Sequence, residues 1–135
     1  MARGHSFWRS LAPHFLSVLR LMAGLLLLEY GTMKILHLPY AEYFANIAPF
    51  SLIWFAGLLE LIGGAVVAVG LFTRCAAFVL SGEMAFAYFI GHAPHGFYPA
   101  LNEGIPAVLF CFVFLYLSAA GGGPWSLDRI IRKGG

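Results

Sequence analysis

The sequence predicts an all-α integral membrane protein, a four-helix bundle in which every long helix spans the bilayer. Of its 135 residues, 61% are hydrophobic and 10% are charged, and the mean hydropathy is +0.83. Soluble domains are typically about 45–50% apolar and about 25% charged, so this chain has too few polar residues to cover a water-facing surface. Residues 1–135 are expected to form one domain whose first partner is the lipid bilayer. The net charge of +2 gives no reason to expect a nucleic-acid partner.

Four apolar runs predict the membrane spans. About 20 apolar residues are enough to cross the hydrocarbon core of a bilayer. Such runs predict spans at about 16–36, 51–72, 75–91 and 102–120. The last is the clearest, because no charged residue lies between Gly104 and Leu127. The first is expected to be a retained helix rather than a signal peptide, since it contains Glu29 and Lys34 and no small-residue cleavage site follows it.

The basic residues predict the orientation of these spans. They lie in the N-terminal segment, in the turn after the second span and in the C-terminal tail: Arg3, Arg9, Arg74, Arg129, Arg132 and Lys133. The other two connections, residues 37–50 and 92–103, contain no lysine or arginine. Because lysine and arginine are enriched in cytoplasmic loops, we expect both termini in the cytoplasm.

The tail that follows the fourth span predicts a short helix on the inner membrane surface. Ser126 can cap its start, and Asp128 in its first turn suits the helix dipole. Trp125 would anchor this helix at the interface. Arg20, about one turn inside the inner edge of the first span, has two possible roles. Its side chain either reaches out to water or forms a structural ion pair with Asp128, and charge alone does not decide between them.

Each span carries or adjoins one carboxylate: Glu29, Glu60, Glu83 and Glu103. From a rise of 1.5 Å per residue, the first three lie roughly 10–14 Å below the outer membrane edge. Charged groups at such depth normally face the bundle interior and pair with one another. We therefore expect a buried polar site in the outer half of the bundle. Its candidate residues are Lys34, Glu60, Glu83 and Glu29, with Asn102 and Glu103 at its mouth.

The charges of this candidate site are unbalanced, because Lys34 is the one cation among three acids near the same level. Desolvation and like-charge repulsion both disfavour the ionised form, so at least one carboxyl group is expected to hold a proton at neutral pH. Such a group can exchange a proton or hydrogen-bond a polar ligand. Alternatively, the carboxylates serve only to hold the helices together.

No metal site or intrinsic cofactor is predicted. Di-iron bundles need Glu-x-x-His on two helices. Here the residues three positions after the four glutamates are Thr32, Gly63, Phe86 and Pro106. The two cysteines form no CxxC pair. His37, His92 and His95 could meet at the outer surface, but we expect them to be hydrated loop residues.

Three stretches follow one another along the chain: LRLMAGLLLLEYGTMKIL, GLLELIGGAVVAVGLFTR and GGGPWSLD. In this order they resemble the DoxX family of small membrane proteins, and the resemblance covers nearly the whole chain. Its most specific parts are Arg20 with Gly31 and Lys34, then Glu60 with Gly63 and Gly64, and finally the closing G-P-x-S-L-D at 123–128. Asn102 and Glu103 resemble the polar pair that opens the family's fourth helix. Glu29 belongs to none of these motifs.

The resemblance implies a multi-pass protein of the bacterial inner membrane. The family is named for a subunit linked to thiosulfate:quinone oxidoreduction, and some relatives are linked to oxidative-stress complexes. We therefore expect a small subunit or partner of a quinone-linked membrane redox system, with a quinone as the candidate ligand of the buried site. The chain has no flavin, haem or iron–sulfur motif, so whether it has catalytic activity of its own stays open. Its protein partner would be a membrane redox complex or further copies of the same chain.

Two other functions remain open from the sequence. The buried carboxyl groups could serve a proton or small-solute carrier, although the inverted repeats and broken helices of common transporters are not evident. The chain could also be a non-catalytic membrane scaffold or assembly factor. Bound quinone, proton flux in liposomes, or neither would distinguish the three functions.

Overall fold

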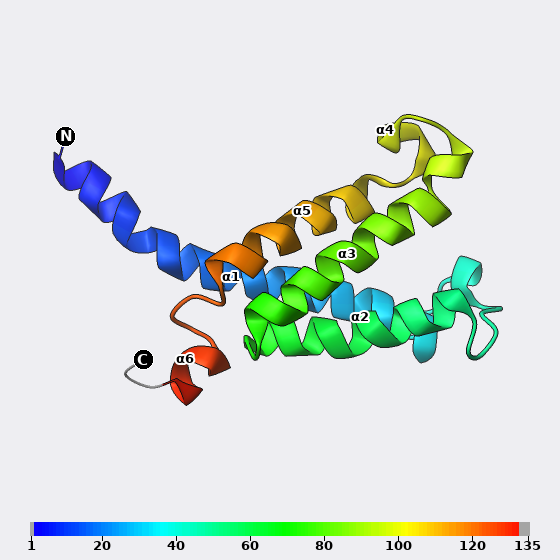
Figure 1. The fold of residues 1–135 in the computed structure, drawn as a ribbon, viewed down its shortest axis with the longest axis horizontal. Coiled ribbons are helices and arrows are strands. Elements are labelled where there is room, and N and C mark those ends of the chain that lie inside the picture. The colour runs from blue at the N-terminus through cyan, green and yellow to red at the C-terminus, as the bar shows by residue number, and fades with distance from the viewer. Residues whose placement is uncertain (1, 133–135) are drawn as a thin grey trace.

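The computed structural model describes residues 2–132, which contain helices and no strand (Figure 1). The α-helices are α1 (Ala2–Ile35), α2 (Leu52–Val69), α3 (Thr73–Gly91), α4 (Pro99–Asn102), α5 (Ile105–Ala120) and α6 (Leu127–Ile131). Two 3₁₀ turns, Glu42–Phe44 and Ala93–His95, lie in the two long connections. The all-α prediction is therefore confirmed. Lys133, which the sequence placed with the basic tail, lies outside the described residues.

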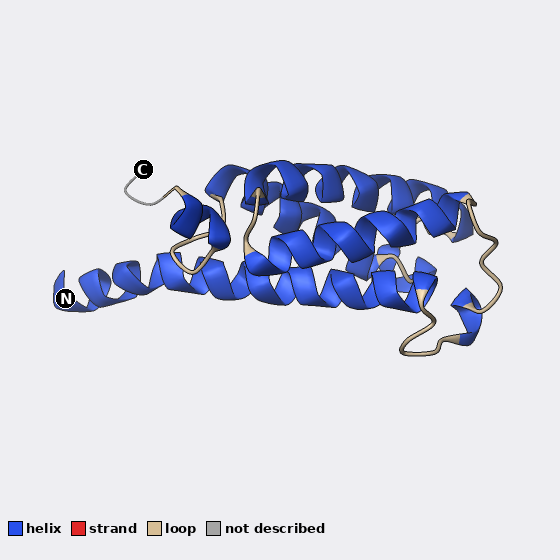
Figure 2. Cartoon of the chain, turned by 90° about the horizontal axis from the view of Figure 1, so that it is seen from below, coloured by secondary structure: helices blue, strands red, loops and turns tan. Residues whose placement is uncertain are grey.

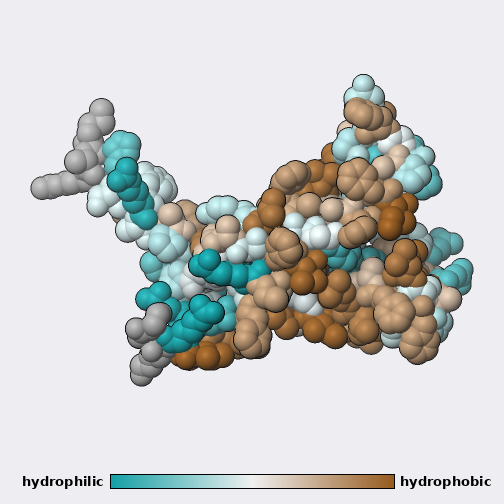
Figure 3. All heavy atoms as spheres, viewed as in Figure 1, coloured by the Kyte–Doolittle hydropathy of each residue, from teal (hydrophilic) through white to brown (hydrophobic). Residues whose placement is uncertain are grey.

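Three segments of these residues are long and apolar enough to cross a membrane: Gly4–Ile35, Leu52–Val69 and Thr73–His95. Helix α5 is also apolar but shorter, with 16 residues. On the face shown in Figure 3, hydrophobic side chains cover much of the surface over the helix pairs, whereas hydrophilic ones gather towards the two ends. A helix that is apolar on its outer side as well as its inner side is typical of a membrane span.

The long helices pack as two pairs, α1 with α2 and α3 with α5, and contacts between the pairs are fewer. In Figure 1 the α3–α5 pair is inclined to the α1–α2 pair, and the two diverge towards the long connections. We call that end of the molecule the loop end and the opposite end, where α6 lies, the α6 end. The view in Figure 2 shows α1 extending past the other helices towards the N-terminus.

Glycines bring α1 and α2 into backbone contact. A Cβ atom on Gly64 would lie 2.6 Å from the backbone nitrogen of Leu28, which leaves no room for a side chain. A Cβ atom on Gly31 would collide with the backbone nitrogen of Leu61 in the same way. Close approach through small residues is the usual way for membrane helices to associate. These contacts set the register that places Lys34 opposite α2.

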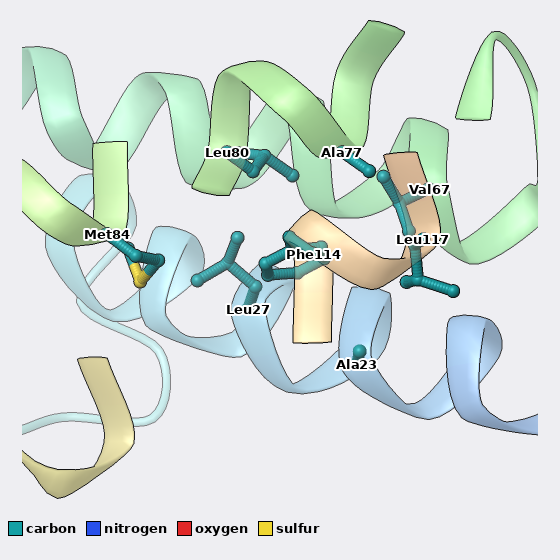
Figure 4. Close-up of a cluster of buried hydrophobic side chains, with 8 residues drawn as sticks. All are labelled: Ala23, Leu27, Val67, Ala77, Leu80, Met84, Phe114 and Leu117. Atoms are coloured by element: carbon teal, nitrogen blue, oxygen red, sulfur yellow. The ribbon is translucent and has the colours of Figure 1, made fainter. Parts of the chain in front are cut away.

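The core is small and draws on all four long helices. Its buried side chains are Ala23, Leu27, Val67, Ala77, Leu80, Met84, Phe114 and Leu117 (Figure 4). Phe114 is fully buried and lies between side chains of the other pair. This cluster is the main apolar contact between the two helix pairs, since those pairs otherwise meet sparsely.

Three helices begin at other residues than the sequence indicates. Helix α1 begins at Ala2 rather than at about residue 16, so it extends well beyond the predicted first span. The predicted fourth span, 102–120, is interrupted: α4 ends at Asn102, Glu103 adopts a left-handed conformation with φ of 61°, and α5 begins at Ile105. Asn102 therefore does not cap the fourth helix; its Oδ1 accepts a hydrogen bond from the Gly104 amide at 2.9 Å and shapes the turn. Helix α3 begins at Thr73 rather than at residue 75, because a side chain from the tail caps it.

The short helix predicted in the tail is present as α6. Ser126 is its N-cap, and its hydroxyl accepts a hydrogen bond from the Arg129 amide at 3.2 Å. Ile130 and Ile131 are 69% and 67% exposed. These side chains give α6 an apolar surface that faces away from the protein.

Candidate functional site

Lys34 and Glu60 form an ion pair between α1 and α2. The Lys34 ammonium group lies 2.8 Å and 3.0 Å from the two carboxylate oxygens of Glu60. Glu60 is 1% exposed and the side chain of Lys34 is 13% exposed. The ammonium group also lies 5.3 Å above the ring of Phe44, a distance suited to a cation–π contact. Within the described residues this is the one ion pair shorter than 4.0 Å.

Glu83 on α3 is the third member of this group. Its carboxyl group lies close enough to Glu60 and Lys34 to interact electrostatically with both. Both Glu83 oxygens are buried, and no described residue donates a hydrogen bond to either of them. An ionised carboxylate only accepts hydrogen bonds, so two facing carboxylates cannot satisfy each other unless one holds a proton. We call Lys34, Glu60 and Glu83 the polar triad.

A cavity of about 370 Å³ lies beside the polar triad, in the gap between α1 and α5. Its lining residues are Leu26, Glu29, Tyr30, Met33, Tyr43, Pro106 and Phe110. Tyr30 connects the cavity to the triad, because its hydroxyl is close enough to both Glu29 and Glu60 to interact electrostatically with them. Its ring packs edge-on to Phe110, with 6.3 Å between the centroids. Most of the remaining lining is apolar, so the cavity has one polar side.

The structure brings together three of the six residues proposed for the buried polar site, namely the polar triad. Glu29 is exposed and lines the cavity instead. Glu103 is exposed in the turn between α4 and α5. Asn102 is 4% exposed and serves the same loop, since its amide donates to the Gly96 carbonyl at 2.9 Å and to the Tyr88 hydroxyl at 3.2 Å.

Sequence reasoning missed Tyr30, although a signal for it existed. Tyr30 lies four residues before Lys34, and residues at that spacing share a helix face. The candidates from the sequence were five charged residues and one asparagine, and no tyrosine was among them. A tyrosine hydroxyl, however, also needs a partner when it is buried.

The proposed pair of Arg20 and Asp128 is replaced by two separate sets of contacts in the same corner of the molecule. Arg20 is 3% exposed and donates to the carbonyls of Gly122 at 2.9 Å and Trp125 at 2.8 Å. The side chain therefore neither reaches out to water nor forms a direct ion pair with Asp128. Ser17 joins this contact, accepting from the Trp125 amide and donating to the Gly122 carbonyl, each at 3.1 Å.

Asp128 caps α3. Its two oxygens accept hydrogen bonds from the amides of Phe72 at 2.7 Å and Thr73 at 2.9 Å, the first free donors of that helix. Burial alone would raise the pKa of Asp128, but the hydrogen bonds from Thr73 and Phe72 outweigh it and hold the pKa below its usual range. The folded protein therefore stabilises the ionised form of Asp128 over the protonated form.

The histidines and cysteines do not assemble into a metal site in residues 2–132, where no three His, Cys, Asp or Glu side chains come together. His92 uses its Nδ1 in a 3.0 Å hydrogen bond with the Asn102 carbonyl. Cys75 and Cys111 are free thiols.

Two comparisons relate the chain to known proteins. The DoxX family model matches residues 15–93. A Haemophilus influenzae protein, described as an uncharacterized protein, is 41% identical over 127 residues, which cover 90% of this chain and 93% of that protein. No solved structure matches. All members of the polar triad lie within residues 15–93, whereas α5 and α6 lie beyond them.

Proposed function

The chain belongs to the DoxX family of membrane proteins, and from this premise we propose that it is a small subunit or partner of a quinone-linked redox system. The proposed location is the bacterial inner membrane. In this arrangement α1, α2, α3 and α5 all span the bilayer, and both termini face the cytoplasm. The distribution of lysine and arginine supports this orientation.

The observation that carries this proposal is the unsatisfied carboxyl group of Glu83 beside the Lys34–Glu60 ion pair. A buried acceptor without a donor costs about 1–3 kcal/mol, and more when it is charged. A bound molecule with a hydroxyl group would remove that cost by donating to Glu83. The head group of a quinol has such hydroxyls, and its oxidised form has carbonyls that Lys34 can donate to.

The cavity between α1 and α5 supports the same ligand class. It adjoins the polar triad through Tyr30, and side chains such as Leu26, Met33 and Phe110 give it an apolar lining. A molecule with a polar head and a hydrocarbon tail would place its tail along these residues and its head towards Tyr30 and the triad. This route would lead directly from the lipid phase to the site.

The residues of the chain determine which part of the redox reaction it could carry out and which part its partner must carry out. Oxidation of a quinol releases two electrons and two protons. The ionised carboxyl group of the Glu60–Glu83 pair would accept one proton and release it before accepting the second, whereas the electrons must pass to a redox centre of the partner. In this proposal the chain binds the head group and handles protons, and it carries no electrons itself.

Glu83→Gln tests the proposal. The amide keeps the size of the side chain and supplies an N–H group that can donate to Glu60, so the melting temperature should stay the same or rise. The neutral amide can satisfy Glu60 and is a weaker acceptor for a quinol hydroxyl than a carboxylate, so the quinone retained after mild detergent extraction should fall strongly. Glu103→Gln, which alters an exposed carboxylate in the α4–α5 turn, is the matched control and should retain quinone normally. Equal retention by both variants would refute a role for the triad in binding.

A second candidate function, proton transfer across the membrane, is favoured by the proximity of the Glu60 and Glu83 carboxyl groups. Two such groups can share and exchange a proton without any other ligand. Proton flux in proteoliposomes that is lost in Glu83→Gln, with no quinone bound by the unmodified protein, would support this function. The absence of both activities would favour a scaffold.

A further inference from the structure

A second cavity, of about 350 Å³, lies at the α6 end, well separated in the fold from the polar triad. It is formed where α3 begins, α5 ends and α6 crosses the gap between them. Its lining residues are Phe72, Thr73, Arg74, Cys75, Ala120, Gly121, Gly122, Gly123, Ser126, Asp128, Arg129 and Arg132. We call it the basic pocket.

The charge of the basic pocket is unbalanced. Three arginines, Arg74, Arg129 and Arg132, line it, and all three side chains are exposed. Asp128 is the one acidic residue in its lining, and the amides that start α3 already occupy both of its carboxylate oxygens. The guanidinium groups therefore outnumber the acid, and they carry the N–H donors that suit a phosphate group.

The arginines come from different parts of the chain and meet around a glycine loop. Arg74 is fixed by a 3.0 Å hydrogen bond from one terminal nitrogen to the Ala119 carbonyl at the end of α5. A Cβ atom on Gly121 would lie 3.2 Å from the Nε atom of Arg74, so the absence of a side chain there leaves the guanidinium group accessible. The five N–H groups of an arginine allow it to keep the bond to Ala119 and still bind an anion.

The surroundings of the basic pocket are apolar. Phe72, Trp125, Ile130 and Ile131 are each more than 60% exposed and lie in or next to the elements that form the pocket. Hydrophilic side chains in Figure 3 gather over α6 and the adjoining loop, directly beside this apolar surface. A free anion needs the arginines alone, whereas a phospholipid offers a phosphate group to the arginines and acyl chains to the apolar side chains.

We propose that the basic pocket binds the phosphate group of an anionic phospholipid, in addition to the ligand site proposed for the polar triad. Basic pockets between membrane helices commonly bind anionic head groups, and each arginine near the surface contributes about 1 kcal/mol. The lipid would hold α6 against the membrane and connect it to the start of α3 and the end of α5. This site does not depend on quinone binding.

The test compares two lipids of equal chain length, phosphatidylglycerol and phosphatidylcholine, added to the full chain in a nonionic detergent. Phosphatidylglycerol should raise the melting temperature in a saturable manner, and phosphatidylcholine should not. Arg129→Gln combined with Arg132→Gln should weaken the apparent affinity for phosphatidylglycerol about 30-fold, which corresponds to about 1 kcal/mol for each arginine. The melting temperature of this double variant without lipid should equal that of the unmodified protein, since both side chains are exposed.

Two controls make the result decisive. Arg9→Gln removes a positive charge from α1 outside the basic pocket, and it should leave the affinity unchanged. Inorganic phosphate alone is the second control and should produce less than a tenth of the stabilisation. If Arg9→Gln weakened the affinity as much as the loss of one pocket arginine is expected to, the interaction would be non-specific. That result would refute the site. If phosphate alone gave the full arginine-dependent shift, the ligand would be a free anion and the lipid assignment would be wrong.

Discussion

Asp128 closes the N-terminus of α3 by accepting a hydrogen bond from the amide of Thr73, a residue 55 positions earlier in the chain. A cap normally comes from the residue just before the helix. Here that residue, Phe72, is in a left-handed conformation with φ of 47° and has no side chain that could accept. The tail beyond α5 therefore supplies the cap, so α6 is tied to the turn between α2 and α3.

Asp128→Ala is expected to lower the free energy of unfolding by about 0.5–2 kcal/mol, the usual cost of losing an N-cap. Asp128→Asn keeps one oxygen acceptor and should cost less than Asp128→Ala. Thermal unfolding in detergent measures both. Glu42→Ala, which changes an exposed acid in the connection at the loop end, is the control and should have little effect. Equal melting temperatures for the unmodified protein and Asp128→Ala would contradict the capping role.

The contribution of Asp128 should depend on pH in a defined direction. The pKa of this carboxyl group is lower in the folded protein than its usual value, so the ionised form favours folding. That contribution is complete above the unfolded pKa of about 3.9 and is lost as the pH falls through the lower folded value. The melting-temperature difference between the unmodified protein and Asp128→Asn should therefore be constant from pH 7 to about 5 and shrink below about 4. A difference that already shrinks between pH 7 and 5 would contradict this assignment.

Arg20→Gln is expected to destabilise the protein by about 1.5–3 kcal/mol, because it removes charged donors from the carbonyls of Gly122 and Trp125. Arg20→Lys should destabilise the protein less than Arg20→Gln but more than no change, since one ammonium group cannot reproduce the two diverging hydrogen bonds. Chemical or thermal unfolding in detergent would give the values. Arg9→Gln, on an exposed part of α1, should change the stability by no more than about 0.5 kcal/mol. Similar losses in Arg9→Gln and Arg20→Gln would mean that the buried contacts contribute nothing.

Glu60→Gln and Lys34→Met should have the same effect on ligand binding. The first variant cannot change its charge, and the second removes the cation that pairs with Glu60. We expect both to insert and fold but to lose quinone binding, which can be measured in detergent alongside the melting temperature. Normal binding by Glu60→Gln would reduce the polar triad to a structural role.

The membrane orientation can be checked with cysteine labelling. In a background lacking Cys75 and Cys111, a single cysteine at His95 or Tyr40 should react with an impermeant reagent added from outside. A single cysteine at Arg74 should react only after the membrane is permeabilised. Labelling of position 95 from the cytoplasmic side alone would reverse the proposed orientation.

The sequence was sufficient to place the apolar part of each long helix and the charged residues along it, because both depend on distances along the chain. The position of a residue along a helix does not by itself show which side of the helix it lies on. Glu29 and Lys34 both lie in the part of α1 nearer the loop end, yet Lys34 shares a face with Gly31, which contacts the backbone of α2, and Glu29 does not. The spacing of three residues from Gly31 to Lys34 carried this information, whereas Glu29, two residues from Gly31, falls on another face.

Contacts between distant segments could not be predicted in the same way. Neither role that the sequence left open for Arg20 is observed, because Arg20 and Asp128 each bind backbone groups of a loop or helix end. Every residue has the same backbone groups, so the sequence gives no sign of which carbonyl or amide will be free. The interruption of the fourth span at Glu103 has a similar origin, since a tight turn forms there around the side chain of Asn102.

The unequal attachment of the two helix pairs has a mechanical consequence. At the α6 end, the hydrogen bonds that Arg20 and Arg74 donate and that Asp128 accepts join α1, α3, α5 and the tail, whereas the pairs diverge at the loop end (Figure 1). Lateral pressure from the surrounding lipids acts on both pairs, and the end with fewer bonds deforms first. The polar triad bridges the two pairs, with Lys34 in the last turn of α1 at the loop end. We therefore expect the spacing of the polar triad to respond to bilayer thickness and tension more than the contacts at the α6 end.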